Sequence, residues 1–199
     1  MTIEGDETRA RLLTAARDLY LEVGSARVSL REVARRSGVS AAAVYRHFDN
    51  KQALLQQVCG EGFRIFASYL MRALAAATPA ERMVSCAEQY LSFAVENPRD
   101  YRVIFMSDAD DVIALGPPHL DDGTHDPTFQ FLVDRVKECM AAKVIARGDA
   151  DEVATLIWSH VHGLVSLRLS GLLGRVGNDA AFARLYRHSV DKLLAGLAP

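Results

Sequence analysis

The residues of this sequence with the clearest chemical capacity are hydrogen-bond donors gathered between positions 28 and 51. Hydroxyl, imidazole and ammonium groups reach phosphate oxygens, and a guanidinium group can also pair with the edge of guanine. Six basic and two acidic residues between Arg27 and Lys51 give this stretch a local net charge of +4, whereas the whole chain has −2. A basic patch on an acidic chain favours contact with nucleic acid. An ordinary helical hairpin with a solvated basic face is the alternative.

Two short helices joined by a tight turn are predicted to position these donors. Ser29 and Glu32 have the spacing of a capping box, and Gly38 can end the first helix in the left-handed conformation. Ser40 can cap the second helix. So short a connection forces the helices to cross steeply, as in a helix-turn-helix (residues 29–48) whose second helix enters the major groove of DNA.

The run S-G-V-S-A-A-A-V-Y-R-H-F-D-N-K-Q-A-L-L, which begins at Ser37, resembles the N-terminal domain of the TetR family of bacterial transcription regulators. The likeness covers roughly residues 6–66. It implies a DNA-binding repressor in which Tyr45, His47 and Lys51 grip the DNA backbone. For Tyr45, a packed aromatic ring with an exposed hydroxyl is the alternative.

Base reading is expected from few side chains. Ala41, Ala42 and Ala43 offer only methyl groups, which suit thymine methyls and depart from the longer polar residues of many relatives. Arg31 and Arg46 are then the candidates for a bidentate contact to guanine. The expected DNA-binding residues are Ser29, Arg31, Ser40, Ala41, Ala42, Ala43, Tyr45, Arg46, His47 and Lys51.

The chain as a whole is predicted to be all-α, because every long segment has a 3.6-residue hydrophobic period and none sustains strand alternation. Nine helices are expected, over residues 6–23, 29–37, 40–48, 51–77, 79–97, 98–106, 126–147, 149–171 and from 179 onward. Asp49 is the expected cap of the fourth helix. The resemblance implies a TetR-like architecture, with a DNA-binding domain over 6–66 and an effector-binding and dimerisation domain over 67–199.

The region after residue 51 has a net charge of −4 and many large apolar side chains, so it is not expected to bind nucleic acid. By resemblance it encloses a pocket for an apolar small-molecule effector that releases the protein from its operator. Trp158, His162 and Gly163 match a C-terminal subclass of the family marked by Trp, His and Gly, and Gly163 is expected to mark close helix packing. The candidate pocket residues are Tyr90, Phe93, Tyr101, Phe105, Phe129, Trp158 and His162. Plain core packing is the alternative for each.

A homodimer is expected because the last two helices are apolar on more than one side, which one chain cannot cover. Pairing across a two-fold axis is also how the family dimerises. Two recognition helices related by that axis predict a pseudo-palindromic double-stranded operator. The candidate interface residues are Phe182, Leu185, Tyr186, Ser189 and Leu193.

No catalytic motif is present: neither G-x-S-x-G nor H-E-x-x-H nor a glycine-rich phosphate loop occurs. No enzyme activity, cofactor or metal is therefore expected. His119, His125 and Asp126 could collect a metal with nearby aspartates, but such residues more often keep a loop solvated.

The three cysteines, Cys59, Cys86 and Cys139, are far apart and form no C-x-x-C motif, which suits the reducing cytoplasm. A thiol sensor is the less favoured alternative. The most apolar stretch, residues 153–173, is interrupted by His160, His162 and Arg168, so a buried helix is expected and no membrane span.

Overall fold

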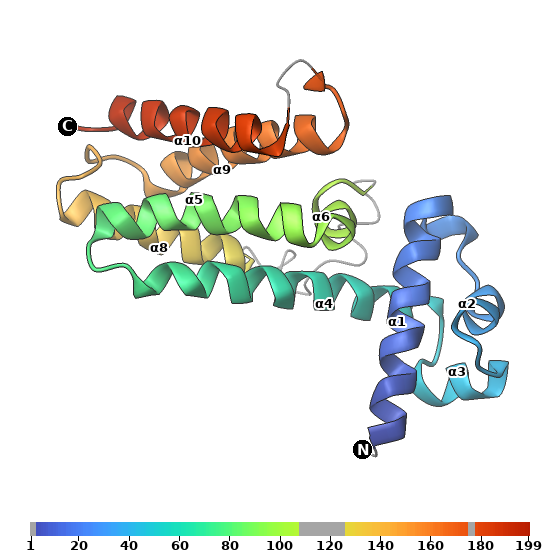
Figure 1. The fold of residues 1–199 in the computed structure, drawn as a ribbon. Helices are drawn as coiled ribbons and strands as arrows, with labels where there is room; N and C mark the ends of the chain where they lie inside the picture. Colours follow the sequence, from blue (N-terminus) through green and yellow to red (C-terminus); the bar gives the residue numbers. More distant parts are fainter. Residues whose placement is uncertain (1–2, 108–125, 175–177) are drawn as a thin grey trace. The chain divides into compact units, whose positions relative to one another are not determined.

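The structure, a computed structural model, describes residues 3–107, 126–174 and 178–199, and in these ranges it contains helices and no strand (Figure 1). The prediction of an all-α chain is therefore confirmed. The elements are α1 (Ile3–Val23), η1 (Ser25–Arg27), α2 (Leu30–Ser37), α3 (Ala41–His47), α4 (Lys51–Arg72), η2 (Ala73–Ala75), α5 (Pro79–Glu96), α6 (Pro98–Phe105), α8 (Pro127–Ala141), α9 (Ala150–Leu169) and α10 (Asp179–Gly196).

The chain forms two compact units. Unit 1 comprises Met1–Arg64 and Arg99–Gly123, and unit 2 comprises Ile65–Pro98 and Thr124–Pro199. Helix α4 contributes its first part to unit 1 and its last turns to unit 2. The domain limits expected from the sequence, 6–66 and 67–199, stay a prediction.

Unit 1 is built around the apolar face of α1, which contacts α2. The side chains that fill its centre are aliphatic or aromatic and are at most 5% exposed: Leu12, Ala16, Leu19, Tyr20, Val33, Val44, Phe48, Leu54 and Leu55. Because α2 and α3 are too short to be stable alone, this burial is what holds them in place.

Helix α6 is held to the other helices of unit 1 by charge and by close packing. Both carboxylate oxygens of the buried Asp100 accept hydrogen bonds from Arg17 Nη1, at 2.9 and 3.0 Å. At the surface, Arg99 pairs with Asp18 at 2.9 Å. A Cβ atom at Gly62 would lie 2.7 Å from Cγ2 of Ile104, so only glycine lets α4 and α6 approach this closely.

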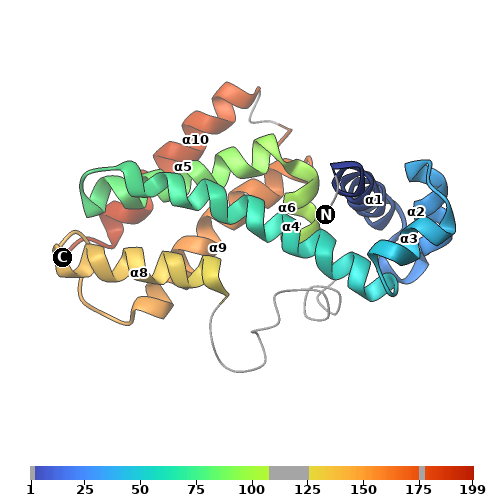
Figure 2. The ribbon, with the colours of Figure 1, turned by 90° about the horizontal axis from the view of Figure 1, so that it is seen from below.

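Unit 2 packs α5 against α8, α9 and α10, an arrangement that can be followed from two directions (Figures 1 and 2). Its core cluster consists of Met83, Val133, Val136, Cys139, Ile145, Ala154 and Ile157. The hydroxyl of the buried Tyr186 on α10 donates to the carbonyl of Ala87 at 2.8 Å, which satisfies a polar group inside this core.

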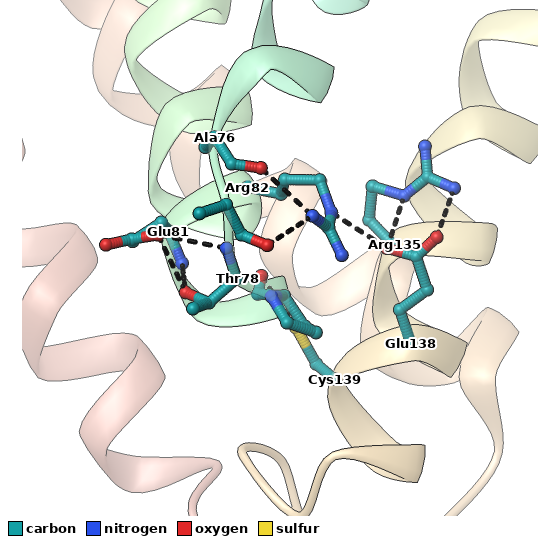
Figure 3. A network of polar contacts seen from close by, with 9 residues as sticks. Ala76, Thr78, Glu81, Arg82, Arg135, Glu138 and Cys139 are labelled. Atoms are coloured by element: carbon teal, nitrogen blue, oxygen red, sulfur yellow. Dashed lines mark hydrogen bonds and ion pairs between the residues drawn. The ribbon is translucent and has the colours of Figure 1, made fainter.

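A polar network holds the η2–α5 connection to α8 (Figure 3). Arg82 Nη1 donates to the carbonyls of Ala76 and Ala77, both at 3.0 Å, while its Nε donates to Glu138 at 3.2 Å. Glu138 also accepts two hydrogen bonds from Arg135. Thr78 completes a capping box with Glu81 at the start of α5.

Two helices end earlier than the sequence predicts. The fourth helix was expected to reach residue 77 but ends at Arg72, and a 3₁₀ turn follows. Its continuation is replaced by the extended backbone of Ala76, whose carbonyl Arg82 binds. The helix expected over 126–147 ends at Ala141, because Lys143 adopts a left-handed conformation (φ 57°) that turns the chain. That turn lets Ile145 enter the core of unit 2.

Two expected caps also differ. Asn50, and not Asp49, caps α4, since its Oδ1 accepts the N–H of Ala53 at 2.8 Å. Ser29 caps α2, but the carboxylate of Glu32 turns to arginines and not back to the cap, so half of the predicted capping box forms.

Candidate DNA-binding site

The α2–α3 pair has the local structure that its capping residues predict. Ser29 Oγ accepts the N–H of Glu32 at 3.2 Å, and Ser40 Oγ accepts the N–H of Ala43 at 3.1 Å. Between the helices Gly38 has φ 70° and ψ 28°, the left-handed conformation that favours glycine. These three residues set the turn, and α2 contacts α3.

The pair separates its side chains into an inner and an outer face. The inner side chains are Leu30, Val33, Ala34, Ala43, Val44 and Phe48, each at most 8% exposed. On the outer face, Ala41, Ala42 and Arg46 are exposed and Tyr45 is 57% exposed. Such exposure of an aromatic ring leaves Tyr45 free to meet a partner, whereas the methyl group of Ala43 faces the interior.

The two serines can cap their helices and still donate. A cap uses an acceptor lone pair of the hydroxyl oxygen, and each hydroxyl keeps its own O–H for another acceptor. Ser29 and Ser40 are both exposed, so a phosphate oxygen can take that position.

Two of the basic residues in this stretch are engaged by carboxylates. Arg35 and Arg36 both bind Glu32, at 2.6 and 3.0 Å, and Arg36 also pairs with Glu22 of α1 at 2.7 Å. The hydrogen bonds from Arg35 and then Arg36 lower the pKa of Glu32 to about 2. In the sequence, Arg35 and Arg36 follow Glu32 by three and four residues, the spacing of helical ion pairs. The same glutamate was predicted to complete a capping box with Ser29, so the two interpretations were in conflict.

The remaining cations differ in their surroundings. Within the described residues, the exposed side chains of Arg31 and Arg46 make no hydrogen bond or ion pair. The ammonium of Lys51, in contrast, donates to the carbonyls of Ser25 and Ala26 at 3.1 and 3.3 Å. His47 is half-buried, with its ring 6.4 Å from that of Phe48.

A residue that the sequence analysis did not single out also braces this region. Arg9 of α1 lies over the ring of Phe48, with its guanidinium carbon 5.9 Å from the ring centre, and donates to Gln57 Oε1 at 2.6 Å. In the sequence, the only sign of this role is that Arg9 is a basic residue within the periodic apolar pattern of α1. That pattern does not identify Phe48 or Gln57 as its partners.

The candidate pocket residues fall into both units. In unit 1, Tyr101 is fully buried and its ring contacts that of Phe105 at 5.2 Å, while Phe105 contacts Phe63. In unit 2, Tyr90 and Phe93 are buried and both contact the ring of Phe66. Their role as ligand contacts stays a prediction.

A polar chain crosses the aromatic side chains of unit 2. Tyr90 Oη lies 3.0 Å from His162 Nδ1, and Ser166 Oγ lies 3.2 Å from His162 Nε2. Burial lowers the pKa of His162, so the imidazole is held in its neutral form. Trp158 contacts His162 and Phe129, which places these three predicted residues together.

The predicted interface residues of α10 differ in exposure. Phe182 and Tyr186 are at most 3% exposed and pack inside unit 2, and Leu193 packs against its core cluster. Ser189 Oγ lies 2.7 Å from His160 Nε2 of α9, and Leu185 is 38% exposed. Their part in a dimer stays a prediction.

Helix α9 carries an apolar surface of its own. Leu156 and Leu167 are 49% and 41% exposed, and they lie with Gly163 on one helical face. A Cβ atom at Gly163 would meet nothing within 4 Å, so no described helix of this chain packs closely against it, contrary to the expectation.

The cysteines are poor candidates for redox chemistry. All three are free and buried. Burial raises the pKa of Cys86 to about 12 and also raises the pKa of Cys139, which keeps both as thiols and not as reactive thiolates.

The described residues contain no group of three or more His, Cys, Asp or Glu side chains placed to hold a metal ion. The predicted loop residues His119, Asp121, Asp122 and His125 lie outside the described ranges, and Asp126 caps α8. None of the described helices is long and apolar enough to cross a membrane.

An all-α chain with a capped helix pair, a glycine turn and an exposed Tyr–Arg face belongs to the class of helix-turn-helix DNA-binding proteins. Residues 12–58 match the family described as "Bacterial regulatory proteins, tetR family". Residues 83–193 match the family described as "Tetracyclin repressor-like, C-terminal domain". The chain therefore belongs to the TetR family of DNA-binding transcriptional regulators.

Two named relatives agree with this assignment. The chain is 31% identical over 104 residues to the HTH-type transcriptional activator FasR of Mycolicibacterium smegmatis, a match that covers 52% of this chain and 48% of FasR. It is 40% identical over 55 residues to the HTH-type transcriptional regulator SrpR of Pseudomonas putida, covering 28% of this chain and 26% of SrpR. The chain thus spans about half the length of FasR and about a quarter of SrpR.

Solved structures share the fold along nearly the whole chain. A protein of unknown function from a Rhodococcus species has a TM-score of 0.73 and 28% identity, with 96% of each chain covered. The TetR family transcriptional regulator PfmR from Thermus thermophilus has a TM-score of 0.70 and 21% identity, covering 95% of this chain and 100% of PfmR. Because PfmR is only 21% identical to this chain, the likeness between the two proteins concerns the fold alone.

Proposed function

We propose that this chain is a homodimeric repressor that binds a pseudo-palindromic operator and is released by a small apolar molecule. The observation that carries the proposal is the outer face of α3, where Tyr45 and Arg46 project beside two exposed alanines. We also propose that residues 6–66 form the DNA-binding domain and residues 67–199 the effector and dimerisation domain.

The phosphate contacts are assigned to side chains that keep a free donor. These are the hydroxyls of Ser29, Ser40 and Tyr45, the imidazole of His47, and the ammonium of Lys51, which donates to the carbonyls of Ser25 and Ala26 and keeps a third N–H. Such groups reach backbone oxygens without reading sequence, so they set the register of the protein on the duplex.

Base reading is assigned to two alanines and two arginines. The exposed methyl groups of Ala41 and Ala42 fit thymine methyls, and they allow α3 to approach the groove floor closely. Arg46 and Arg31 have no partner within the described residues, so each can offer two guanidinium N–H groups to guanine. The buried Ala43 supports α3 from behind.

A two-fold dimer is proposed through the exposed faces of α9 and α10. Leu156 and Leu167 flank Gly163 on α9, and Leu185 lies on α10. Open space beside Gly163 leaves room for a partner helix to approach its backbone closely. Symmetric pairing here would give each dimer two copies of α3, which the two halves of a pseudo-palindrome require.

The effector is proposed to bind in unit 2 beside the polar chain formed by Tyr90, His162 and Ser166. The rings of Phe129 and Trp158 supply apolar contact area, while the hydroxyl and imidazole supply one polar attachment point. An effector that breaks the 3.0 Å Tyr90–His162 contact would disturb α5 and α9 together.

The experiment that tests the function is selection of bound fragments from genomic DNA by the purified chain, followed by a mobility shift of each recovered site. A recovered site with two-fold symmetry, bound more tightly than a scrambled duplex of the same composition, supports the proposal. Failure to retain any fragment at low salt contradicts it, because phosphate attraction alone should give measurable binding there.

Activation is the second candidate, since the relative FasR is named an activator. Repression and activation use the same DNA contacts and differ in where the operator lies at the promoter. Transcription from the recovered promoter, measured with and without the chain, separates them: the repressor proposal expects less transcript when the chain is present.

A further inference from the structure

The carboxylate of Glu32 on α2 binds two arginines of the same helix. Arg35 donates two hydrogen bonds to it, from Nη2 to Oε1 at 2.6 Å and from Nε to Oε2 at 2.8 Å. Arg36 donates from Nε to Oε1 at 3.0 Å, and its Nη1 pairs with Glu22 of α1 at 2.7 Å. These two carboxylates and two guanidinium groups form a cluster without net charge, here named the Glu32 cluster.

The Glu32 cluster lies beside residues that are proposed to contact DNA. Arg35 follows Arg31 by four residues, so both project from one face of α2, and Arg31 is proposed to read bases. The side chain of Arg35 is 72% exposed, whereas that of Arg36 is 28% exposed. Charges act on nearby phosphates over about 10 Å at 0.1 M salt. Of the two arginines, Arg35 is therefore the one better placed to act on a bound duplex.

We infer that Glu32 limits the sequence-independent attraction of this chain to DNA, by compensating the positive charge of Arg35. The inference rests on the proposed DNA binding. It does not require Arg35 to lack a free donor, since a guanidinium group that shares two N–H groups with a carboxylate keeps others. The carboxylate removes net positive charge, and the attraction to DNA depends on how many phosphates positive charge neutralises.

The physical reason is that binding to random DNA consists almost entirely of phosphate attraction, whereas binding to an operator adds base contacts. One more uncompensated arginine would strengthen the attraction to every duplex, and random sites far outnumber operators. The hydrogen bonds from Arg35 and then Arg36 lower the pKa of Glu32 to about 2, so the carboxylate stays charged at neutral pH. Base reading is thereby left to Arg31 and Arg46, which make no hydrogen bond or ion pair within the described residues.

The test compares wild type with Glu32→Gln, which keeps the shape of the side chain and removes its charge. The affinity for a scrambled duplex is measured at several salt concentrations. We expect Glu32→Gln to bind this duplex roughly fivefold more tightly at low salt, with a salt slope that is steeper by up to about 0.9 per subunit. The double variant Glu32→Gln with Arg35→Gln should return both values to those of wild type, because it removes the arginine that the first change releases.

Glu88→Gln is the matched control, because it changes the net charge of the chain equally while Glu88 is exposed on α5, in unit 2. It should bind the scrambled duplex like wild type. The inference is overturned if Glu32→Gln binds no more tightly than wild type, or if Glu88→Gln tightens binding as much. It is also overturned if the gain persists in the double variant, because Arg35 would then not be the cation that causes it.

A second variant and a second measurement separate this effect from a loss of folding. Alanine has the highest helix propensity, so Glu32→Ala should keep α2 folded and give the same gain in affinity. Phenylglyoxal, which reacts with guanidinium groups, should modify Arg35 of the wild-type chain more slowly than Arg46 in the absence of DNA. Equal rates would overturn the inference, since Arg35 would then not be held by Glu32.

Failure of the inference and failure of the proposed function give different results. If wild type binds no duplex at low salt, the proposed function fails, and the inference fails with it. If wild type binds the scrambled duplex and Glu32→Gln gains nothing, the inference alone fails.

Discussion

On α3, side chains with similar exposure are expected to differ in what they contribute to DNA binding. Arg46 can form two parallel hydrogen bonds to one guanine, and neighbouring Ala42 can form none. Tyr45 can donate one hydrogen bond, which suits a phosphate oxygen. The sequence preference of the chain should therefore depend on one or two arginines, with the alanines selecting thymine through methyl contact.

Replacing Arg46 with alanine should relax the sequence preference. Each lost base contact is expected to cost about 1–3 kcal/mol on the recovered site and much less on a scrambled duplex. Competition binding with both duplexes measures the difference, and Arg184→Ala, an exposed arginine of α10, is the control. An equal loss on both duplexes would instead make Arg46 a phosphate contact.

The carboxylate of Glu32 should make stability depend on pH in a defined range. Because Arg35 and Arg36 lower its pKa from 4.5 to about 2 in the folded chain, its stabilising effect is present above 4.5. The effect is lost as the pH falls through about 2, where the folded chain also binds the proton.

Glu32→Gln should therefore unfold at a lower temperature than wild type near neutral pH, and the gap should narrow steadily below pH 4.5. Thermal unfolding across that range measures it, with Glu88→Gln, exposed on α5, as the control. A gap that is constant with pH would show that the carboxylate charge is not responsible.

Two ion pairs join α1 to α6, and their burial predicts different effects on stability. Arg17 and Asp100 are 22% and 8% exposed at the side chain, whereas Arg99 and Asp18 are 59% and 30% exposed. A buried charge that loses its partner is costly, while an exposed pair contributes little because water and salt screen it. The close approach of α4 to α6 at Gly62 adds packing that neither pair supplies.

Asp100→Asn should accordingly lower the free energy of unfolding by up to about 3 kcal/mol, since it leaves the largely buried Arg17 with only the more distant carboxylate of Asp18, at 3.9 Å, as its anion. Arg99→Met, on the same pair of helices, should cost less than about 1 kcal/mol. Urea unfolding of the two variants beside wild type measures both values. Similar small losses would mean that solvent reaches Arg17 and Asp100 freely.

At the scale of the whole molecule, the proposed dimer depends on apolar surface that one chain leaves uncovered. Leu156→Glu places a charge on the exposed face of α9, where it should be buried on association without a partner. The variant should sediment as a monomer and bind the recovered site far more weakly, because a monomer presents one recognition helix.

Met71→Glu is the matched control, since Met71 is 57% exposed on α4, outside the proposed interface. It should sediment like wild type. Wild-type chain that sediments as a monomer at every concentration, or Leu156→Glu that remains dimeric, would exclude this interface.

The sequence by itself predicted the all-α class, the nine α-helices within the described ranges and the capped turn of the helix pair. These features are local: Ser29, Gly38 and Ser40 act on backbone groups within three or four residues of themselves. Helix ends were predicted less well where distant contacts intervene. Ile145 leaves the expected helix because the core of unit 2 takes its side chain.

Only the tertiary structure decided which charged side chains pair across the chain. Arg17 and Asp100 are 83 residues apart, and Lys51 lies 26 residues from Ser25, so no local pattern indicates either contact. The carboxylate of Glu32 had two possible kinds of partner within local reach, the backbone N–H of the Ser29 cap and the arginines one turn away. It binds Arg35 and Arg36, because two guanidinium groups bind a carboxylate more strongly than a single backbone N–H does.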